Sequence, residues 1–220
     1  MSRLPRVLEP EVMDTAEEAR DYDAMDHAAV NRVFVADFLA LSPDTRLVLD
    51  VGTGTAQIPI ELCRADHGAH VIAVDAAAHM LTLARSNIER AGLAARIEPR
   101  LVDAKRLPLE QNLFTAVMSN SIVHHIPEPR AVLAEMLRVL RPGGVLFVRD
   151  LLRPDDETQL EARVRLHGGE EEHGRTMFRE SLHAALTLAE VREMVVSLGR
   201  APAGVATTSD RHWTWACIVP

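Results

Sequence analysis

Short apolar segments rich in Val, Ile and Leu alternate, from about residue 46 onward, with longer segments whose apolar residues recur at helical spacing. This alternation is typical of parallel strands with helices on both faces of a sheet. It predicts seven strands, over residues 46–51, 70–75, 96–102, 113–119, 144–150, 203–208 and 212–219. It also predicts helices, over residues 56–65, 78–91, 129–140 and 188–198. We therefore expect an α/β fold with a doubly wound, Rossmann-like, seven-stranded sheet that is mostly parallel.

The last two predicted strands form an exception to the parallel arrangement. Only Ser209, Asp210 and Arg211 separate them. A parallel crossover needs a much longer connection, so the two strands are expected to form an antiparallel hairpin at one edge of the sheet. The C-terminal strand is therefore predicted to be antiparallel.

Two segments lie outside the repeating pattern. Residues 1–44 carry six acidic residues between Asp14 and Asp26 and then an apolar stripe at helical spacing, which predicts a helical cap on the sheet. The stripe consists of Val30, Val33, Phe34, Phe38 and Leu41. Residues 151–187 contain a polar stretch, 166–174, and follow the fifth strand, where loops of such folds face the ligand. We predict one domain over residues 1–220, with 1–44 as the cap and 151–187 as a substrate-facing insertion.

Composition and charge exclude several functions. The 220 residues are 47% apolar, which is enough for the core of one domain. The formal charge of −8 offers no basic field for nucleic acid or anionic lipid, so no nucleic-acid partner is expected. No apolar run is long enough to span a bilayer or to serve as a secretion signal, which predicts a cytoplasmic protein without membrane insertion. Two distant cysteines support neither a disulfide framework nor a cysteine metal cluster.

The strongest local motif is Asp50-Val51-Gly52-Thr53-Gly54-Thr55-Ala56, at the end of the first strand. Glycines allow a sharp turn there and let a ligand lie against bare backbone N–H groups at a helix N-terminus. Asp50 would repel a diphosphate, but its carboxylate suits a ligand that carries an ammonium group. The alternative is an ordinary turn from strand to helix.

Acidic residues also stand at the ends of the next two strands. Asp75 follows Gly54 by 21 residues, a position where an acid can accept both hydroxyls of a ribose. Asp103 ends the third strand, where its carboxylate could hold an adenine amino group. Either residue alone could equally be a helix cap. Their shared location at the carboxyl ends of neighbouring strands favours a nucleoside site.

Over residues 46–150 the sequence resembles the class I S-adenosylmethionine-dependent methyltransferases. It is particularly similar to the small-molecule branch that includes the ubiquinone and menaquinone methyltransferases. The resemblance rests on the loop 50–56, on Asp75, on Val102-Asp103-Ala104 followed by Leu107-Pro108, on the strand end Ser119-Asn120, and on Leu137-Arg138-Val139-Leu140-Arg141-Pro142-Gly143-Gly144. Tyr22-Asp23-Ala24-Met25 is similar to a segment that closes over the cofactor in that branch. The sequence departs from the usual pattern at Ala56, which replaces a third glycine.

The resemblance implies S-adenosylmethionine as the cofactor and S-adenosylhomocysteine as its product. The cofactor-binding residues that it implies are Tyr22, Asp50, Gly52, Thr53, Gly54, Asp75, Ala76, Met80, Asp103, Ala104, Ser119 and Asn120. In this assignment Asp50 lies near the methionine ammonium, Asp75 takes the ribose hydroxyls and Met80 packs on the adenine. Asp103 and the N–H of Ala104 face the edge of the adenine, and Ser119 and Asn120 border the methionine part through their backbone carbonyls.

His124 and His125 follow the fourth strand and are the candidate catalytic residues. An imidazole with its ordinary pKa of about 6.5 can take a proton from a nucleophile. The alternative is that the two histidines orient the loop. The run from His167 to His173 lacks the paired ligands of a metal site, so no metal is predicted and a solvated or substrate-facing loop is favoured.

These observations predict a methyltransferase that passes a methyl group to a small-molecule acceptor by in-line displacement. Two alternatives stay open at this point. One is methylation of a macromolecule, either a protein or a tRNA. The other is a regulator that binds the cofactor without transferring its methyl group.

Overall fold

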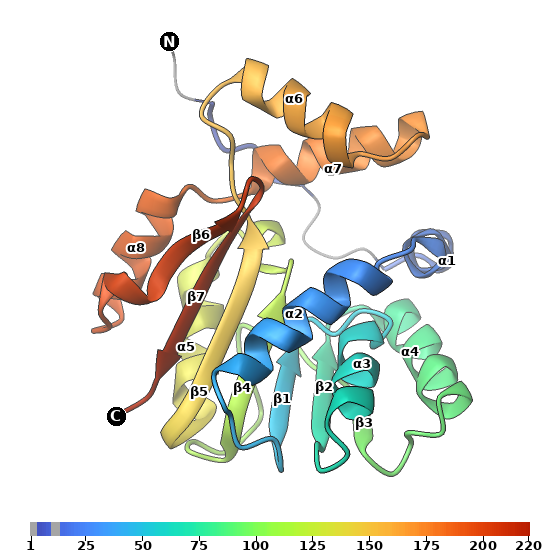
Figure 1. Ribbon diagram of the computed structural model, residues 1–220, viewed down its shortest axis with the longest axis vertical. Helices are drawn as coiled ribbons and strands as arrows, with labels where there is room; N and C mark the ends of the chain where they lie inside the picture. The colour runs from blue at the N-terminus through green and yellow to red at the C-terminus, as the bar shows by residue number, and fades with distance from the viewer. Residues whose placement is uncertain (1–3, 10–13) are drawn as a thin grey trace. The chain divides into compact units, whose positions relative to one another are not determined.

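The computed structural model describes residues 4–9 and 14–220 (Figure 1). Its strands are β1 (Val48–Val51), β2 (Val71–Asp75), β3 (Ile97–Leu101), β4 (Phe114–Asn120), β5 (Leu140–Leu151), β6 (Val205–Ser209) and β7 (His212–Ile218). Its α-helices are α1 (Ala16–Ala24), α2 (Ala28–Ala40), α3 (Gln57–Ala65), α4 (Ala78–Arg90), α5 (Pro129–Val139), α6 (Glu157–His167), α7 (Glu172–Ala184) and α8 (Leu188–Ser197). Two 3₁₀ turns complete the set, η1 (Val123–His125) and η2 (Pro202–Gly204).

The strands form one seven-stranded sheet in the order β3-β2-β1-β4-β5-β7-β6. β1 pairs in parallel with β2 and β4, and β2 pairs in parallel with β3. β6 and β7 pair antiparallel at one edge, as the short connection between them predicted. The predicted seven-stranded, mostly parallel sheet is confirmed. The strand order reverses beside β1, and in open α/β sheets ligands bind outside the carboxyl ends of the strands at that point.

The described residues divide into two compact units. The larger unit comprises residues 14–120, 131–148 and 216–220, and the smaller one comprises 4–9, 121–130 and 149–215. The single domain expected from the sequence stays a prediction. None of the described helices is long and apolar enough to cross a membrane.

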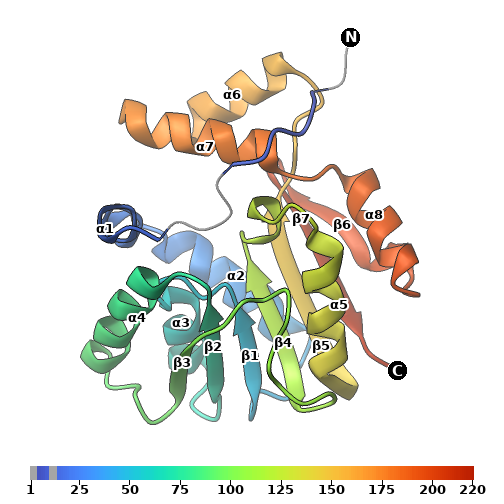
Figure 2. The same ribbon diagram turned by 180° about the vertical axis from the view of Figure 1, so that it is seen from behind.

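In the larger unit, α2 and α3 lie on one face of the sheet and α5 on the other (Figures 1 and 2). The core includes Phe34 and Phe38, whose rings lie 5.0 and 6.0 Å from the ring of Phe147 on β5. The predicted stripe on α2 is wrong in part, because Val30, Val33 and Leu41 are exposed. The helix instead buries the face made by Asn31, Phe34, Val35 and Phe38.

In the smaller unit, α6 and α7 pack through an apolar cluster that includes Leu160, Val164 and Leu182. An ion pair between Arg179 and Glu161 joins the two helices. Most of the polar stretch 166–174 is helical, because α6 runs to His167 and α7 begins at Glu172. The insertion 151–187 is therefore largely a helical hairpin.

Candidate functional site

Asp50 lies on β1 and is 2% exposed. Its backbone is paired with Ala73 of β2 on one side and with Met118 of β4 on the other, so the residue sits inside the sheet. Oδ2 has no hydrogen-bond partner among the described residues. Burial raises the pKa of this carboxyl to about 7; the charge of Asp75 adds to the rise, and the Thr53 hydroxyl opposes it. A buried acid that lacks a partner is costly, and a cationic group beside it would remove that cost.

The loop after β1 turns sharply through left-handed backbone conformations. Gly52 and Gly54 have φ angles of +75° and +55°, which glycine adopts without a steric cost. Ala56 also has a positive φ, of 64°, and precedes α3 directly. A left-handed non-glycine residue costs about 1–2 kcal/mol. The replacement of a third glycine by Ala56 therefore leaves the turn intact but strained.

The backbone N–H groups of Gly52, Thr53 and Gly54 in this loop already have partners. The amides of Gly52 and Thr53 donate to the carbonyl of Val74, at 2.8 and 3.0 Å, and the amide of Gly54 donates to Oδ2 of Asp75 at 2.8 Å. The expectation of bare amides is wrong, because buried backbone donors in a folded chain find acceptors wherever these are within reach. The side-chain atoms at the loop that are buried and have no partner among the described residues are Oδ2 of Asp50 and the hydroxyls of Thr53 and Thr55.

Asp75 ends β2 and holds the glycine loop against that strand. Oδ1 accepts the amide of Ala77 at 2.9 Å, while Oδ2 accepts that of Gly54. Burial raises the pKa of Asp75, and the N–H groups that it accepts oppose the rise. Each carboxylate oxygen can accept a second hydrogen bond. Asp75 can therefore still bind hydroxyl groups.

The segment after β3 lies next to Asp75, whose carbonyl accepts the amide of Val102 at 2.8 Å. The side chain of Asp103 is 57% exposed and accepts the amide of Lys105 at 2.9 Å, with the ammonium of Lys105 at 3.6 Å. Ala104 is half-buried. The structure thus brings Asp103 near Asp75, with the side chain of Asp103 exposed to solvent. Ala76, which follows Asp75, is exposed.

Tyr22 and Met80 bring apolar surface to the same region. Both belong to a small cluster with Ala19 and Ala77. A methyl group added at the Cα atom of Gly54 would lie 3.6 Å from the ring of Tyr22. Helix α1 therefore contacts the glycine loop. Burial and the charges of nearby acids, Asp75 and Asp50 among them, raise the pKa of Tyr22 to about 12. The phenol therefore stays protonated.

Ser119 and Asn120 stand at the end of β4. Ser119 is buried, and its hydroxyl donates to the carbonyl of Val51 at 2.8 Å. The hydroxyl thus ties β4 to β1, which leaves the backbone as the part of Ser119 that a ligand could meet. Asn120 is half-buried.

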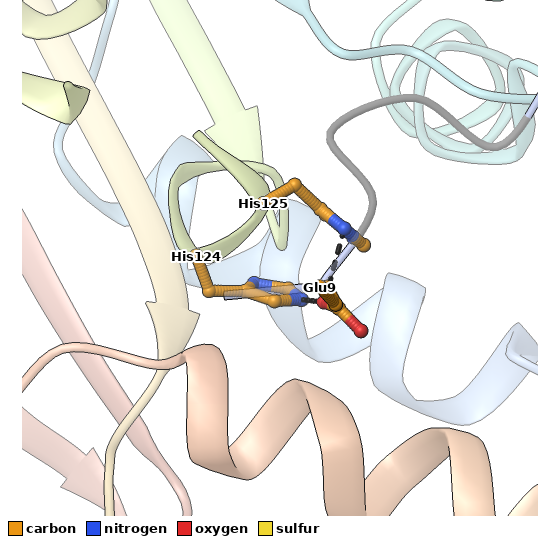
Figure 3. A group of neighbouring side chains, drawn as sticks. All are labelled: Glu9, His124 and His125. Atoms are coloured by element: carbon orange, nitrogen blue, oxygen red, sulfur yellow. Dashed lines mark ion pairs between the residues drawn. The ribbon is translucent and has the colours of Figure 1, made fainter. Parts of the chain in front are cut away.

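The two predicted catalytic histidines belong to the smaller unit and lie on η1. His124 is buried between two carboxylates: Nδ1 is 2.5 Å from Oδ1 of Asp150, and Nε2 is 3.3 Å from Oε1 of Glu9. Burial alone would lower the pKa of His124, but Asp150 and Glu9 outweigh it and raise the pKa. Nδ1 of His125 lies 3.0 Å from the same oxygen of Glu9 (Figure 3).

Glu9 is a site residue that the sequence analysis missed. Burial would raise the pKa of its carboxyl, but His125 and His124 outweigh burial and lower it. Asp150 behaves in the same way. Burial alone would raise the pKa of its carboxyl, but the interaction with His124 outweighs burial, and the net effect is a lowered pKa. The sequence signals for this cluster are the pair His124-His125 and Asp150 at the end of the fifth strand, and neither indicates that Glu9 meets the histidines.

Comparisons with known proteins agree with the geometry of the larger unit. Residues 49–148 match a family described as "Methyltransferase domain". A demethylmenaquinone methyltransferase of Renibacterium salmoninarum is 37% identical over 125 residues, which cover 56% of this chain and 48% of that protein. A ubiquinone/menaquinone biosynthesis C-methyltransferase of a Ruegeria species is 33% identical over 149 residues, which cover 64% of this chain and 59% of that protein. The matched segments cover between 31% and 59% of the length of curated relatives such as these.

The fold has close counterparts among solved structures. The crystal structure of a SAM-dependent methyltransferase from Aquifex aeolicus superimposes with a TM-score of 0.68 at 18% identity. The alignment covers 94% of this chain and 99% of that one, so the shared fold extends beyond the segment that matches in sequence. The resemblance to class I S-adenosylmethionine-dependent methyltransferases noted in the sequence is confirmed over residues 49–148, which match a methyltransferase domain, and quinone-type methyltransferases are among the relatives of the chain.

Proposed function

We propose that this chain transfers a methyl group from S-adenosylmethionine to a small-molecule acceptor by in-line displacement. The observation that carries the proposal is Asp50, a buried carboxylate beside the glycine loop with one oxygen that has no partner in the described part of the chain. It lies within the residues that match the methyltransferase family.

The residues of the larger unit fit the cofactor. Asp50 would hold the methionine ammonium, and the second acceptor positions of Asp75 would hold the ribose hydroxyls. The apolar cluster of Tyr22, Ala77 and Met80 would cover the adenine. We further propose that Asp103, Ala104, Ser119 and Asn120 border the cofactor as the family resemblance implies.

When bound, the sulfonium supplies a methyl carbon that is already activated toward a nucleophile. The chain then has to hold the reactants in line and exclude water, and correct placement alone can supply about 7–11 kcal/mol. Asp50 would fix one end of the cofactor through its charge. Tyr22, whose phenol stays neutral, would shield the glycine loop without adding a charge.

Proton removal would fall to His125 when the acceptor loses a proton on methylation. Nε2 of His125 makes no hydrogen bond within the described part of the chain, whereas both ring nitrogens of His124 face carboxylates. An imidazole needs a free nitrogen to accept a proton. We therefore assign His124 the role of positioning its neighbour, whose ring centroid lies 4.1 Å away.

Two observations support a small acceptor. Relatives named for demethylmenaquinone and for ubiquinone/menaquinone biosynthesis match this chain. The charge of −8 disfavours RNA, whose phosphates would be repelled. We propose a demethylated quinol as the first acceptor to assay.

Calorimetry with S-adenosylhomocysteine tests the cofactor site. Wild type should bind, Asp50→Asn should bind more weakly, and Asp21→Asn, an exposed acid with the same loss of charge, should behave as wild type. Absence of heat with both S-adenosylmethionine and S-adenosylhomocysteine on folded protein would overturn the proposal.

Transfer of a labelled methyl group tests the reaction. Label in the quinol fraction is the expected result. Label in added protein or tRNA would identify a macromolecular methyltransferase instead. Cofactor binding without transfer to any of the three acceptor classes would favour a regulator.

A further inference from the structure

Glu9, His124 and His125 bring three potential metal ligands to one point (Figure 3). One ligand atom from each side chain lies within 4.8 Å of the other two. The side chains of Glu9, His124 and His125 are 12%, 3% and 20% exposed. The cluster is therefore largely shielded from water.

The spacing of the ligand atoms suits a metal ion. Zinc binds imidazole nitrogen at about 2.0–2.1 Å, which in a tetrahedral site separates neighbouring ligand atoms by about 3.3 Å. Oε1 of Glu9 lies 3.3 Å from Nε2 of His124 and 3.0 Å from Nδ1 of His125. These separations are those of neighbouring ligands around one ion.

Asp150 provides the outer interaction that metal-bound histidines usually have. Its Oδ1 lies 2.5 Å from Nδ1 of His124, which places the proton on Nδ1 and directs the lone pair of Nε2 toward Glu9. Asp150 is itself fixed, since it accepts the backbone amides of Val123 and Leu151, each at 2.5 Å. Two acceptors, Nε2 and Oε1, then face each other and need either a shared proton or a cation between them.

Glu9 reaches the histidines on a segment that is anchored along its length. The amide of Leu4 donates to the carbonyl of Asp155, and that of Val7 to the carbonyl of His183. The Arg6 guanidinium donates to the carbonyl of His124 at 3.1 Å, with further bonds to the carbonyls of Ile126 and Ala184. The hydroxyl of Ser181 lies 3.3 Å from the second carboxylate oxygen of Glu9. The position of the carboxylate thus follows from the fold.

We propose that Glu9, His124 and His125 bind one divalent transition-metal ion through a carboxylate oxygen, Nε2 and Nδ1 respectively. Two imidazoles and one carboxylate suit Zn²⁺, Fe²⁺, Co²⁺ and their neighbours better than Mg²⁺ or Ca²⁺, which prefer oxygen. Three protein ligands leave at least one position open for water or another small ligand. The inference does not depend on cofactor binding, but it bears on the proposed base: when Nδ1 of His125 binds a metal, Nε2 keeps the ring proton, so the metal-bound chain cannot use His125 to take a proton from the acceptor.

Titration with Co²⁺ tests this site in the full chain, freed of affinity tag and stripped with a chelator. Wild type should bind one equivalent and develop the d–d absorption of a nitrogen- and oxygen-ligated ion, and Zn²⁺ should displace it. Glu9→Gln and His125→Gln should each weaken binding by about tenfold or more, and Asp150→Asn by about 10–100-fold. His173→Gln, an exposed histidine of the same unit, is the matched control and should bind as wild type.

Absence of saturable Co²⁺ and Zn²⁺ binding by wild type would overturn the proposal and leave a cluster held by a shared proton. Binding that is unchanged in Glu9→Gln and His125→Gln would also overturn it. Glu9→Gln keeps the size and an oxygen acceptor of the side chain, so it is the variant least expected to disturb the fold. Calorimetry with S-adenosylhomocysteine on the same samples separates failure of this site from failure of the cofactor site.

Discussion

Asp50→Asn should stabilise the protein without cofactor while it weakens cofactor binding. Asp50 is 2% exposed, and its Oδ2 has no partner among the described residues. Its pKa rises from an ordinary 3.8 to about 7, with burial as the main cause. Asparagine has nearly the same size and carries no charge, so the substitution removes the cost of ionising this buried group.

The size of the effect follows from linkage between ionisation and folding. Because the folded pKa lies above the unfolded one, the favourable contribution of Asp50 is complete below pH 3.8 and is lost as the pH rises through about 7. A tenfold change in an ionisation constant is worth about 1.4 kcal/mol. The loss of folding free energy caused by ionising Asp50 in the folded state therefore grows from about 2 kcal/mol at pH 5.5 to an upper limit of about 4 kcal/mol at pH 8.5. Asp50→Asn should gain stability over wild type by an amount that increases across this range.

Urea unfolding followed by far-UV circular dichroism at the two pH values measures this difference. Asp21→Asn, which removes an exposed charge from α1, serves as the control and should differ little from wild type at either pH. A stability difference between Asp50→Asn and wild type that is the same at pH 5.5 and pH 8.5 would refute the argument. Protonation of Asp50 in the unliganded protein also predicts that wild type binds S-adenosylhomocysteine more weakly as the pH falls below 7, and that Asp50→Asn loses this dependence.

Three further substitutions have defined expectations. Asp75→Ala should weaken S-adenosylhomocysteine binding by about 1–3 kcal/mol in calorimetry, because buried ribose hydroxyls would lose an acceptor; unchanged affinity would contradict our placement of the ribose. Phe34→Ala should lower the free energy of unfolding by about 3–5 kcal/mol, because it opens a cavity beside Phe147, whereas Val33→Ala on the exposed side of α2 should change it by less than about 0.5 kcal/mol. Thr187→Ala removes the side-chain cap of α8 and should cost about 1 kcal/mol in the same assay; no loss would show that the cap is dispensable.

The sheet could be predicted because its strands are marked by local apolar runs and its helices by local periodicity. The start of β5 could not. The sequence predicts a helix to residue 140 and a strand from Gly144, whereas β5 begins at Leu140. The extension depends on a distant partner: the amide of Gly143 donates to the carbonyl of Val219 at 2.7 Å, and the amide of Val219 donates to the carbonyl of Gly144. A local pattern contains no information about that pairing.

The insertion shows the same limit. A polar stretch with two adjacent glycines predicted a loop over residues 166–174, but Gly168 and Gly169 interrupt the helices only briefly. The hairpin of α6 and α7 is stabilised by contacts across it, such as the ion pair of Glu161 with Arg179. Those contacts compensate for the low helix propensity of Gly174, which lies inside α7.

The cofactor site around Asp50 could largely be predicted from the sequence, whereas the histidine cluster could not. Asp50 and the glycine loop are neighbours in the chain, and Asp75 joins them because the carboxyl ends of adjacent parallel strands lie at one edge of a sheet. Fold class alone therefore sufficed to assemble those residues. The histidine cluster needs Glu9, whose neighbours Leu8 and Pro10 carry no motif. Its place depends on several hydrogen bonds between the segment 4–9 and residues far along the chain, and a set of ligands assembled in that way can be recognised only once the fold is known.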